Sequence, residues 1–299
     1  MGGVGGGDSS GEDGLHLVVF DFDHTVVEVN SDPAAILGVD AEHREEHEAL
    51  LREAGSRGEW TQGMDAALRR VADHGRTQED IRDVLRGVGL TEPGDVMLGA
   101  LQRLASHPGT DLRIVSDANT VFIDEILSAH RIRDAFSAVV SNPASWVPHN
   151  TGTRLRVTPF HGAPSTSGPD DDDLDAPGRS ERTAADAGGG LRPAHTCPRC
   201  PRNLCKGEVV TSWLCERAWT SITYVGDGRN DVCPSLLLPA AAPPTSTVPS
   251  WTGGRVLARD GFPLAAALRA ADPPLRAALH VWHDATALAR LLDPSAAAV

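Results

Sequence analysis

The sequence has no run of basic residues and few aromatic ones. Its 299 residues include 27 Lys and Arg against 41 Asp and Glu, which gives a formal net charge of −14, and only 4% of them are aromatic. Nucleic acids and anionic membranes attract concentrated positive charge, so this balance argues against binding to either. An acidic protein that binds an anion must instead gather positive charge at one place.

Long apolar runs are also missing. No stretch approaches the roughly 20 consecutive apolar residues that a membrane-spanning helix needs. The start, MGGVGGGDSSGEDG, has neither the basic region nor the apolar core of a secretory signal. Five cysteines are an odd number, and three of them crowd between positions 197 and 205, unlike a secreted disulfide framework. We therefore expect a soluble protein with reduced thiols, cytoplasmic unless an organelle holds it.

What is present is a series of short apolar runs separated by helical patterns. Strands are predicted at residues 15–23, 111–117, 137–142, 221–227 and 255–258. A helix is predicted at residues 120–129, with Asn119 as its N-cap. Strands that alternate with helices favour an α/β fold, with a Rossmann-like doubly wound parallel sheet and a site at the carboxyl ends of its strands.

The pattern also suggests how the chain is divided. Residues 33–106 show helical spacing of apolar side chains and predict a helical cap inserted after the first strand. Residues 15–32 and 107–299 then form the α/β core. Residues 1–14 are predicted to be a disordered tail, and the acidic, Gly-rich residues 162–194 a disordered insertion. A Pro/Ala-rich stretch at 238–250 is expected to loop over the surface.

The sequence DFDHT follows the first strand and contains two carboxylates and a hydroxyl. Side chains two apart on a strand share a face, so Asp21 and Asp23 can look into one pocket together with Thr25. One carboxylate could attack phosphorus and form an acyl-phosphate. The other could protonate the departing alcohol and later deprotonate water. A solvated acidic turn is the alternative interpretation of this motif taken alone.

The sequence GDGRND follows another apolar strand and places Asp227 and Asp231 four residues apart. Carboxylates near Asp21 would form the oxygen-rich site that Mg²⁺ prefers, and the ion would offset repulsion of an anionic substrate. The alternative is a Gly-Asp turn in which Asp231 caps a helix.

Two further residues suit phosphate binding. Ser116 ends a predicted strand, and Lys206 precedes a predicted helix. A hydroxyl, backbone amides at a helix start and a compact ammonium group can all hold phosphate oxygens. Taken singly, a Ser at this position is more often a helix cap and a Lys is more often solvated.

The order of these motifs resembles the haloacid dehalogenase superfamily of phosphatases. The resemblance implies that Asp21 is the nucleophile and that Asp23 is the acid/base, with its carbonyl as a metal ligand. Asp21 is expected to bind the metal ion as well. It implies Asp227 as a further ligand of Mg²⁺, Asp231 as support for the metal site, and phosphate binding by Thr25, Ser116 and Lys206.

The flanking sequences narrow the resemblance. FDFDHTVVEVNSD, IVSDANT, TPFH, CPRCPRNLCK, YVGDGRND and ARDGFPL are similar to the phosphoethanolamine/phosphocholine phosphatase family and its relatives acting on pyridoxal phosphate, thiamine phosphate or pyrophosphate. His24 departs from the pattern, since acidic or small residues are common there. The resemblance implies that Asp32 and Asp117 contact an amino-alcohol head group. Both could instead cap helices.

Phosphoethanolamine ranks above phosphocholine in this interpretation. Two carboxylates suit an ammonium group, whereas a quaternary ammonium gains more from an aromatic cage, and aromatic residues are scarce here. The alternative substrates are pyridoxal phosphate, thiamine phosphate or pyrophosphate. A phosphate-sensing or metal-binding scaffold without activity is a different class of function, and the intact Asp21 and Asp23 argue against it. Oligomeric state is left open.

Cys197, Cys200 and Cys205 form a compact cluster, with His195 nearby. Zinc binding and a redox pair are both conceivable, although structural zinc sites usually join two separated pairs of ligands. The sequence favours reduced thiols packed beneath the segment that delivers Lys206, because free cysteines are often buried.

Overall fold

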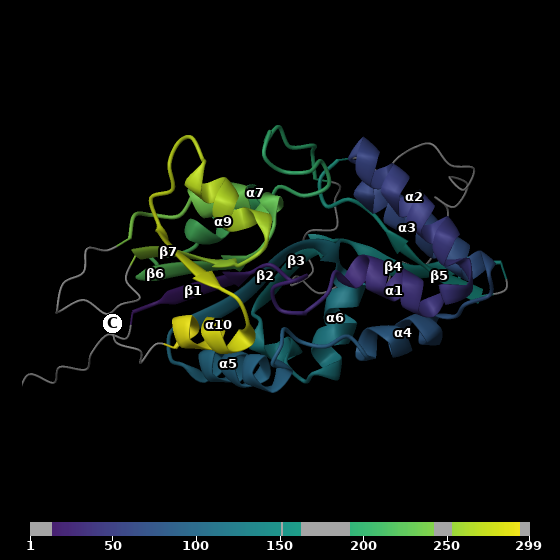
Figure 1. Ribbon diagram of the computed structural model, residues 1–299, viewed down its shortest axis with the longest axis horizontal. Coiled ribbons are helices and arrows are strands. Elements are labelled where there is room, and N and C mark those ends of the chain that lie inside the picture. Colours follow the sequence, from purple (N-terminus) through teal and green to yellow (C-terminus); the bar gives the residue numbers. More distant parts are fainter. Residues whose placement is uncertain (1–13, 151, 163–191, 242–252, 294–299) are drawn as a thin grey trace, which may run out of the picture.

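The computed structural model describes residues 14–150, 152–162, 192–241 and 253–293 (Figure 1). The predicted N-terminal tail, except for its last residue, lies outside these residues. So do nearly all of the predicted insertion at 162–194 and most of the Pro/Ala-rich stretch. Within the described part of the chain, no helix has the length and apolar character needed to cross a membrane.

A six-stranded parallel sheet forms the centre of the protein, in the order β3-β2-β1-β6-β7-β8. This confirms the predicted α/β fold. Chain order and sheet order differ, so β1 and β6 are neighbours although about 200 residues separate them. The strands are β1 (His16–Phe20), β2 (Thr110–Asn119), β3 (Ala138–Asn142), β6 (Ser221–Gly226), β7 (Gly253–Arg259) and β8 (Ala278–Trp282).

Helices cover both faces of the sheet, as the continuous apolar runs of the strands require. Val18 and Phe20 of β1 face the layer of α5 (Gly94–Ser106), α6 (Thr120–Ala129) and α10 (Ala285–Leu292). Leu17 and Val19 face the layer of α7 (Lys206–Leu214), α8 (Val232–Leu236) and α9 (Pro263–Arg269). Figure 1 shows these layers below and above the sheet.

A second group of elements lies beyond the carboxyl ends of β1 and β2. It consists of α1 (Ser31–Val39), α2 (Arg44–Arg57), α3 (Trp60–Asp73) and α4 (Gln78–Arg86), packed with an antiparallel hairpin of β4 (Ala144–His149) and β5 (Gly152–Val157) (Figure 1). The sequence interpretation did not include this hairpin. Helix α5 packs against β2 and α10, which places it with the sheet.

A buried carboxylate ties the helices of this second group together. The carboxylate oxygens of Asp40 lie 3.0 Å from His43 Nδ1, 2.8 Å from His47 Nε2 and 2.6 Å from His74 Nδ1, and one accepts from Arg76 Nε at 3.3 Å. Burial opposes ionisation of Asp40, but these four partners outweigh it and hold its pKa well below the ordinary value. Asp40 therefore links the end of α1 to α2 and to the segment after α3.

We expect Asp40→Asn to lower the free energy of unfolding at pH 7 by about 2–4 kcal/mol, because it removes a buried charge on which four donors converge. Since the folded pKa is lowered, the stabilisation is present above the unfolded pKa and is lost as pH falls below about 4. Urea unfolding at pH 7 and at about pH 2.5, below the unfolded pKa, measures both effects. Asp83→Asn, at an exposed carboxylate paired with Arg86, is the control. Equal stability of Asp40→Asn and the unmodified protein at pH 7 would contradict this role.

Candidate active site

The carboxyl ends of β1 and β6 bring two of the predicted carboxylates together. The Asp21 amide donates to the Val225 carbonyl at 2.8 Å, which carries the pairing of the two strands one residue past β1. Asp227 follows β6 directly, and its Oδ1 accepts from Thr25 Oγ1 at 3.4 Å. Asp21 and Asp227 are 4% and 7% exposed, so both carboxylates are held at the sheet edge away from bulk water.

Lys206 is the cation of this site. It is the first residue of α7 and is fully buried, and its Nζ lies 2.8 Å from Asp21 Oδ2 and 2.8 Å from Asp231 Oδ1. Burial alone lowers the pKa of an ammonium group, but the charges of Asp21 and Asp231 outweigh it and raise the pKa of Lys206. Lys206 is also the only lysine in the sequence. The site therefore holds a permanent positive charge.

Asp231 is fully engaged by its neighbours. Its Oδ1 accepts from Lys206 Nζ and from Tyr224 Oη at 2.6 Å, and its Oδ2 accepts from the amides of Asp227 at 3.0 Å and Gly228 at 2.9 Å. This carboxylate organises the turn after β6 and orients Lys206, and its side chain does not cap α8. Tyr224, buried within β6, was not among the residues expected from sequence.

The turn after β6 leaves no room for a side chain at Gly226. A Cβ built there would lie 2.5 Å from Asp231 Oδ2. Glycine is thus required for Asp231 to fold back beneath the strand end.

Three carboxylates face one ammonium group in a small volume. One oxygen each of Asp21, Asp227 and Asp231 lies within 4.8 Å of the others. Burial, with the charge of Asp231, raises the pKa of Asp21, and the same causes raise the pKa of Asp227 to about 7. This excess of negative charge and the oxygen donors fit a divalent cation such as Mg²⁺.

Asp23 lies beside this cluster in a different environment. Its Oδ1 accepts from the Ser31 amide at 2.9 Å. Burial raises the pKa of Asp23 to about 7, although the hydrogen bonds from Ser31 oppose the shift. A carboxyl group with this pKa can donate and accept a proton near neutral pH.

Ser116 lies at the same edge of the sheet. Phe20 of β1 is in register with Ile114 of β2, so Ser116 follows two residues beyond the level of Phe20. Its Oγ is buried and accepts from the Ala118 amide at 3.3 Å. The strand continues to Asn119, two residues past the predicted end.

Asp32 and Asp117 line a cavity next to Asp23. The cavity has a volume of about 210 Å³, and its walls are Asp23, Asn30, Asp32, Trp60, Asp117 and Ala118. Asp32 Oδ2 accepts from Trp60 Nε1 at 2.8 Å. Burial and the charge of Asp23 raise the pKa of Asp32. The three carboxyl groups around this small cavity can accept hydrogen bonds from a cationic group.

The helix-capping alternative for these two aspartates is wrong. The side chain of Asn30 caps α1 by accepting from the Asp32 amide at 3.1 Å, and Asn119 caps α6 by accepting from the Phe122 amide at 3.0 Å. Asp32 and Asp117 are therefore free of the capping role.

His24 occupies the turn that follows Asp23. Its backbone has a positive φ of 53°, and its carbonyl accepts from Arg259 NH1 at 2.7 Å. Its ring lies 5.1 Å from the ring of Phe262. Arg259 also pairs with Glu28 at 2.6 Å, so the end of β7 holds the turn that follows Asp21 and Asp23. Arg259 belongs to the ARDGFPL segment, but the sequence predicted no role for it.

Comparison with known proteins agrees with this chemistry. The model of the Putative Phosphatase family matches residues 16–295. Human pyridoxal phosphate phosphatase PHOSPHO2 is 30% identical over 74% of this chain and 78% of its own length. Inorganic pyrophosphatase 2 of Arabidopsis thaliana is 31% identical over 79% of this chain and 72% of its own length. The thiamine phosphate phosphatase-like protein of the same plant is 28% identical over 79% of this chain and 82% of its own length.

These similarities confirm the predicted relationship to phosphatases named for pyridoxal phosphate, thiamine phosphate and pyrophosphate. None of the three relatives is named for phosphoethanolamine or phosphocholine, so they favour the alternative substrates over the first choice made from sequence. The chain belongs to the Putative Phosphatase family and is a hydrolase of phosphoric monoesters.

Proposed function

We propose that the chain is a Mg²⁺-dependent phosphatase that passes the phosphoryl group through Asp21. The observation that carries the proposal is the buried position of Lys206 between Asp21 and Asp231, next to Asp227. A permanent cation beside a carboxylate cluster can hold phosphate oxygens while one carboxylate attacks phosphorus. A scaffold without activity would not need so costly a buried arrangement.

Hydrolysis then takes two displacements. A carboxylate oxygen of Asp21 forms a bond to phosphorus as the ester oxygen leaves, and the leaving oxygen takes a proton from Asp23. Water next attacks phosphorus, gives a proton to Asp23, and releases the Asp21 carboxylate. Thr25, Ser116 and Lys206 hold the phosphate oxygens in both steps.

The metal site is part of this proposal. Asp21, Asp227 and the Asp23 carbonyl would hold Mg²⁺, with Asp231 in support. When bound, the ion supplies charge that offsets repulsion between the phosphate and the carboxylates. The residues of the chain supply the nucleophile and the proton, and they orient the phosphate group.

The helical group beyond the sheet edge suits the role of a cap over this site. We assign the cap to α1–α4 together with the β4–β5 hairpin, since these elements pack with one another. The packing of α5 on the sheet supports a boundary earlier than the residue 106 predicted from sequence. Trp60 of α3 lines the acidic cavity, so the cap contributes to the pocket that meets the substrate.

The acidic cavity guides the choice of substrate. A small phosphate ester with a protonated or cationic nitrogen would place that nitrogen near Asp32 and Asp117, and would lower the raised pKa of Asp32 by favouring its ionised form. Pyridoxal phosphate and thiamine phosphate both fit this description, and both occur in the names of relatives. Pyrophosphate carries no positive charge. We therefore place pyridoxal phosphate and thiamine phosphate first, and phosphoethanolamine after them.

A panel of phosphate compounds tests this function. We expect phosphate release that requires Mg²⁺, with kcat/KM for pyridoxal phosphate or thiamine phosphate at least about 10-fold above that for pyrophosphate. Asp32→Asn should lower kcat/KM about 10-fold for the preferred cationic substrate and leave phenyl phosphate nearly unchanged, because only the former uses the charge of Asp32.

The matched control is Asp124→Asn, at a half-exposed carboxylate paired with Arg133. It should leave every rate unchanged. Equal losses on cationic and neutral esters in Asp32→Asn would remove the argument for a cationic substrate. Turnover that is indifferent to Mg²⁺ and to chelators would contradict the metal-dependent mechanism.

A further inference from the structure

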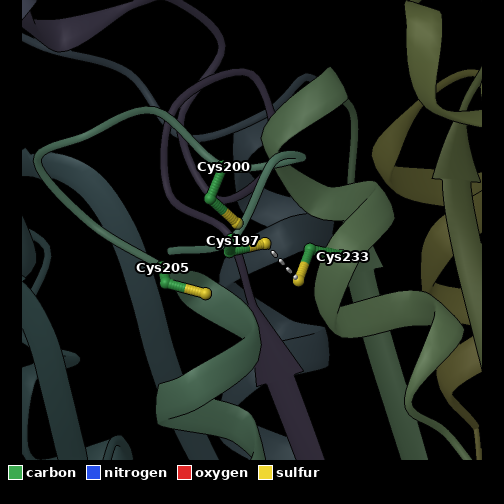
Figure 2. A group of neighbouring side chains, drawn as sticks. All are labelled: Cys197, Cys200, Cys205 and Cys233. Atoms are coloured by element: carbon green, nitrogen blue, oxygen red, sulfur yellow. Dashed lines mark hydrogen bonds between the residues drawn. The ribbon is translucent and has the colours of Figure 1, made fainter. Parts of the chain in front are cut away.

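Four of the five cysteines meet at one point beside the active site. Figure 2 shows Cys197, Cys200, Cys205 and Cys233 with their side chains directed toward a common centre. Their sulfur atoms all lie within 4.8 Å of one another, and Cys197 Sγ is 3.5 Å from Cys233 Sγ. All four are free thiols. Cys233, which the sequence interpretation did not include, comes from α8, whereas the other three lie in the segment before α7 and at its start.

The spacing of the sulfurs fits a tetrahedral metal better than a disulfide. Zinc binds thiolate sulfur at about 2.3 Å, which puts the sulfurs of a tetrahedral site about 3.8 Å apart. The 3.5 Å between Cys197 and Cys233 is close to this separation. A disulfide would bring two sulfurs to about 2.05 Å and leave two others out. Four thiols converging from two parts of the chain are what a four-ligand site requires.

His195, the fourth ligand that the sequence made available, is engaged elsewhere. Its Nε2 lies 2.8 Å from the Pro201 carbonyl, and its Nδ1 accepts from the Cys197 amide at 3.2 Å. Both ring nitrogens thus fix the loop that presents Cys197. The ligand set is made of sulfur alone.

The loop that carries Cys197 and Cys200 is held by hydrogen bonds, such as that from Arg199 to the Asp272 carbonyl at 3.0 Å, but by little apolar packing. Residues 193–205 contain no helix or strand, and Leu204 is their one buried large apolar side chain. Apolar burial is the usual source of order in such a segment. A metal ion can supply that order instead, as in small domains whose folding depends on zinc.

The helix that follows is fitted closely to this cluster. A Cβ at Gly207 would lie 2.4 Å from Cys233 Sγ, so glycine lets α7 approach the sulfur of α8. Cys205 is the N-cap residue of α7, so the start of this helix carries one sulfur of the cluster.

We propose that Cys197, Cys200, Cys205 and Cys233 bind one structural Zn²⁺. Four thiolates fill the coordination shell, so no position remains for water or substrate, and the site is structural. Cys205 immediately precedes Lys206, and Cys233 lies two residues after Asp231. The ion would therefore join the two segments whose side chains meet in the 2.8 Å contact between Lys206 and Asp231.

Metal analysis of the purified full chain is the first test, and it is independent of phosphatase activity. We expect about one zinc per chain after removal of loosely bound metal. Replacement by Co²⁺ should produce an intense near-ultraviolet charge-transfer band, which requires thiolate ligands and cannot come from the aspartates of the active site. Protein from zinc-supplemented growth that lacks zinc, or that carries iron or a disulfide at these cysteines, would overturn the proposal.

Cysteine variants provide the second test. Cys233→Ser should lose zinc and unfold at a lower temperature, whereas Cys215→Ser, at the exposed fifth cysteine, should keep about one zinc per chain and the original stability. In the unmodified protein only Cys215 should react rapidly with a thiol reagent until a strong chelator is added. Rapid reaction of all five thiols without chelator contradicts the site even if Cys233→Ser fails to fold.

Discussion

Replacing Asp21 with Asn is expected to reduce kcat/KM by at least about 10³-fold on every substrate. The amide has nearly the same shape as the carboxylate but cannot donate an electron pair to phosphorus at a useful rate. Lys206 keeps its second partner, Asp231, at 2.8 Å, so its charge stays compensated. Removal of one of three crowded carboxylates also lowers their mutual repulsion, and the variant should fold.

The measurement combines turnover with a chemical trap. Acid quenching of the unmodified enzyme during reaction with ³²P-labelled substrate should leave label on the protein, because an acyl-phosphate survives in acid. Asp21→Asn should carry no label, yet should still bind inorganic phosphate through Lys206. Asp73→Asn, at a half-exposed carboxylate paired with His149, serves as the control and should behave as the unmodified enzyme. A folded Asp21→Asn protein that turns over at the original rate would refute the nucleophile assignment.

Much of the sheet could be predicted because its strands are short and apolar, and because Asp21 and Asp227 directly follow β1 and β6. The helix at Thr120–Ala129 and its cap Asn119 were predicted with the bounds that the structure has. Asp21 and Asp227 were expected to meet, and they do so because β1 and β6 are parallel neighbours whose carboxyl ends share one edge. The alternation of strands and helices is a local pattern that a sequence can express, and parallel strands then place their carboxyl ends at one edge.

Other parts of the structure depend on contacts between distant residues, which no local sequence pattern predicts. The β4–β5 hairpin has a proline and a half-polar alternation, and it is held by packing against α3. Tyr224 looks like any buried strand residue, although its hydroxyl lies 2.6 Å from Asp231. Cys233 stands 28 residues after Cys205 and beside a motif already interpreted as a metal site, so its partners could be found only in three dimensions.

The scarcity of lysine in the sequence could also have pointed to the site. A chain with 27 basic residues has a single lysine, and that lysine is the buried ammonium of the site. Arginine serves everywhere else. A compact ammonium group fits between two carboxylates where the broad guanidinium of arginine would not. The single lysine therefore marks a position that arginine cannot fill.

We expect Lys206→Met to lower kcat/KM by at least about 10²-fold and the free energy of unfolding by about 3–5 kcal/mol, since it leaves Asp21 and Asp231 buried without their shared cation. Burial and the charge of Asp231 raise the pKa of Asp21 and of Asp227, and the charge of Lys206 opposes this rise. Its removal raises both pKa values, so the acid limb of the pH profile of residual kcat/KM should move to higher pH. Methionine is unbranched and keeps most of the length of the side chain, so lost charge is the main change.

Two comparisons separate this electrostatic role from simple packing. Lys206→Arg keeps the charge, and it should leave the acid limb near its original pH even if its size lowers kcat. Mg²⁺ should raise the unfolding temperature of Lys206→Met more than that of the unmodified protein, because the uncompensated carboxylates gain more from a cation that binds the folded state. If Lys206→Met kept the original acid limb and an unchanged response to Mg²⁺, Lys206 would be a space-filling residue. The proposed balance of three carboxylates, one ammonium and one divalent ion would then be wrong.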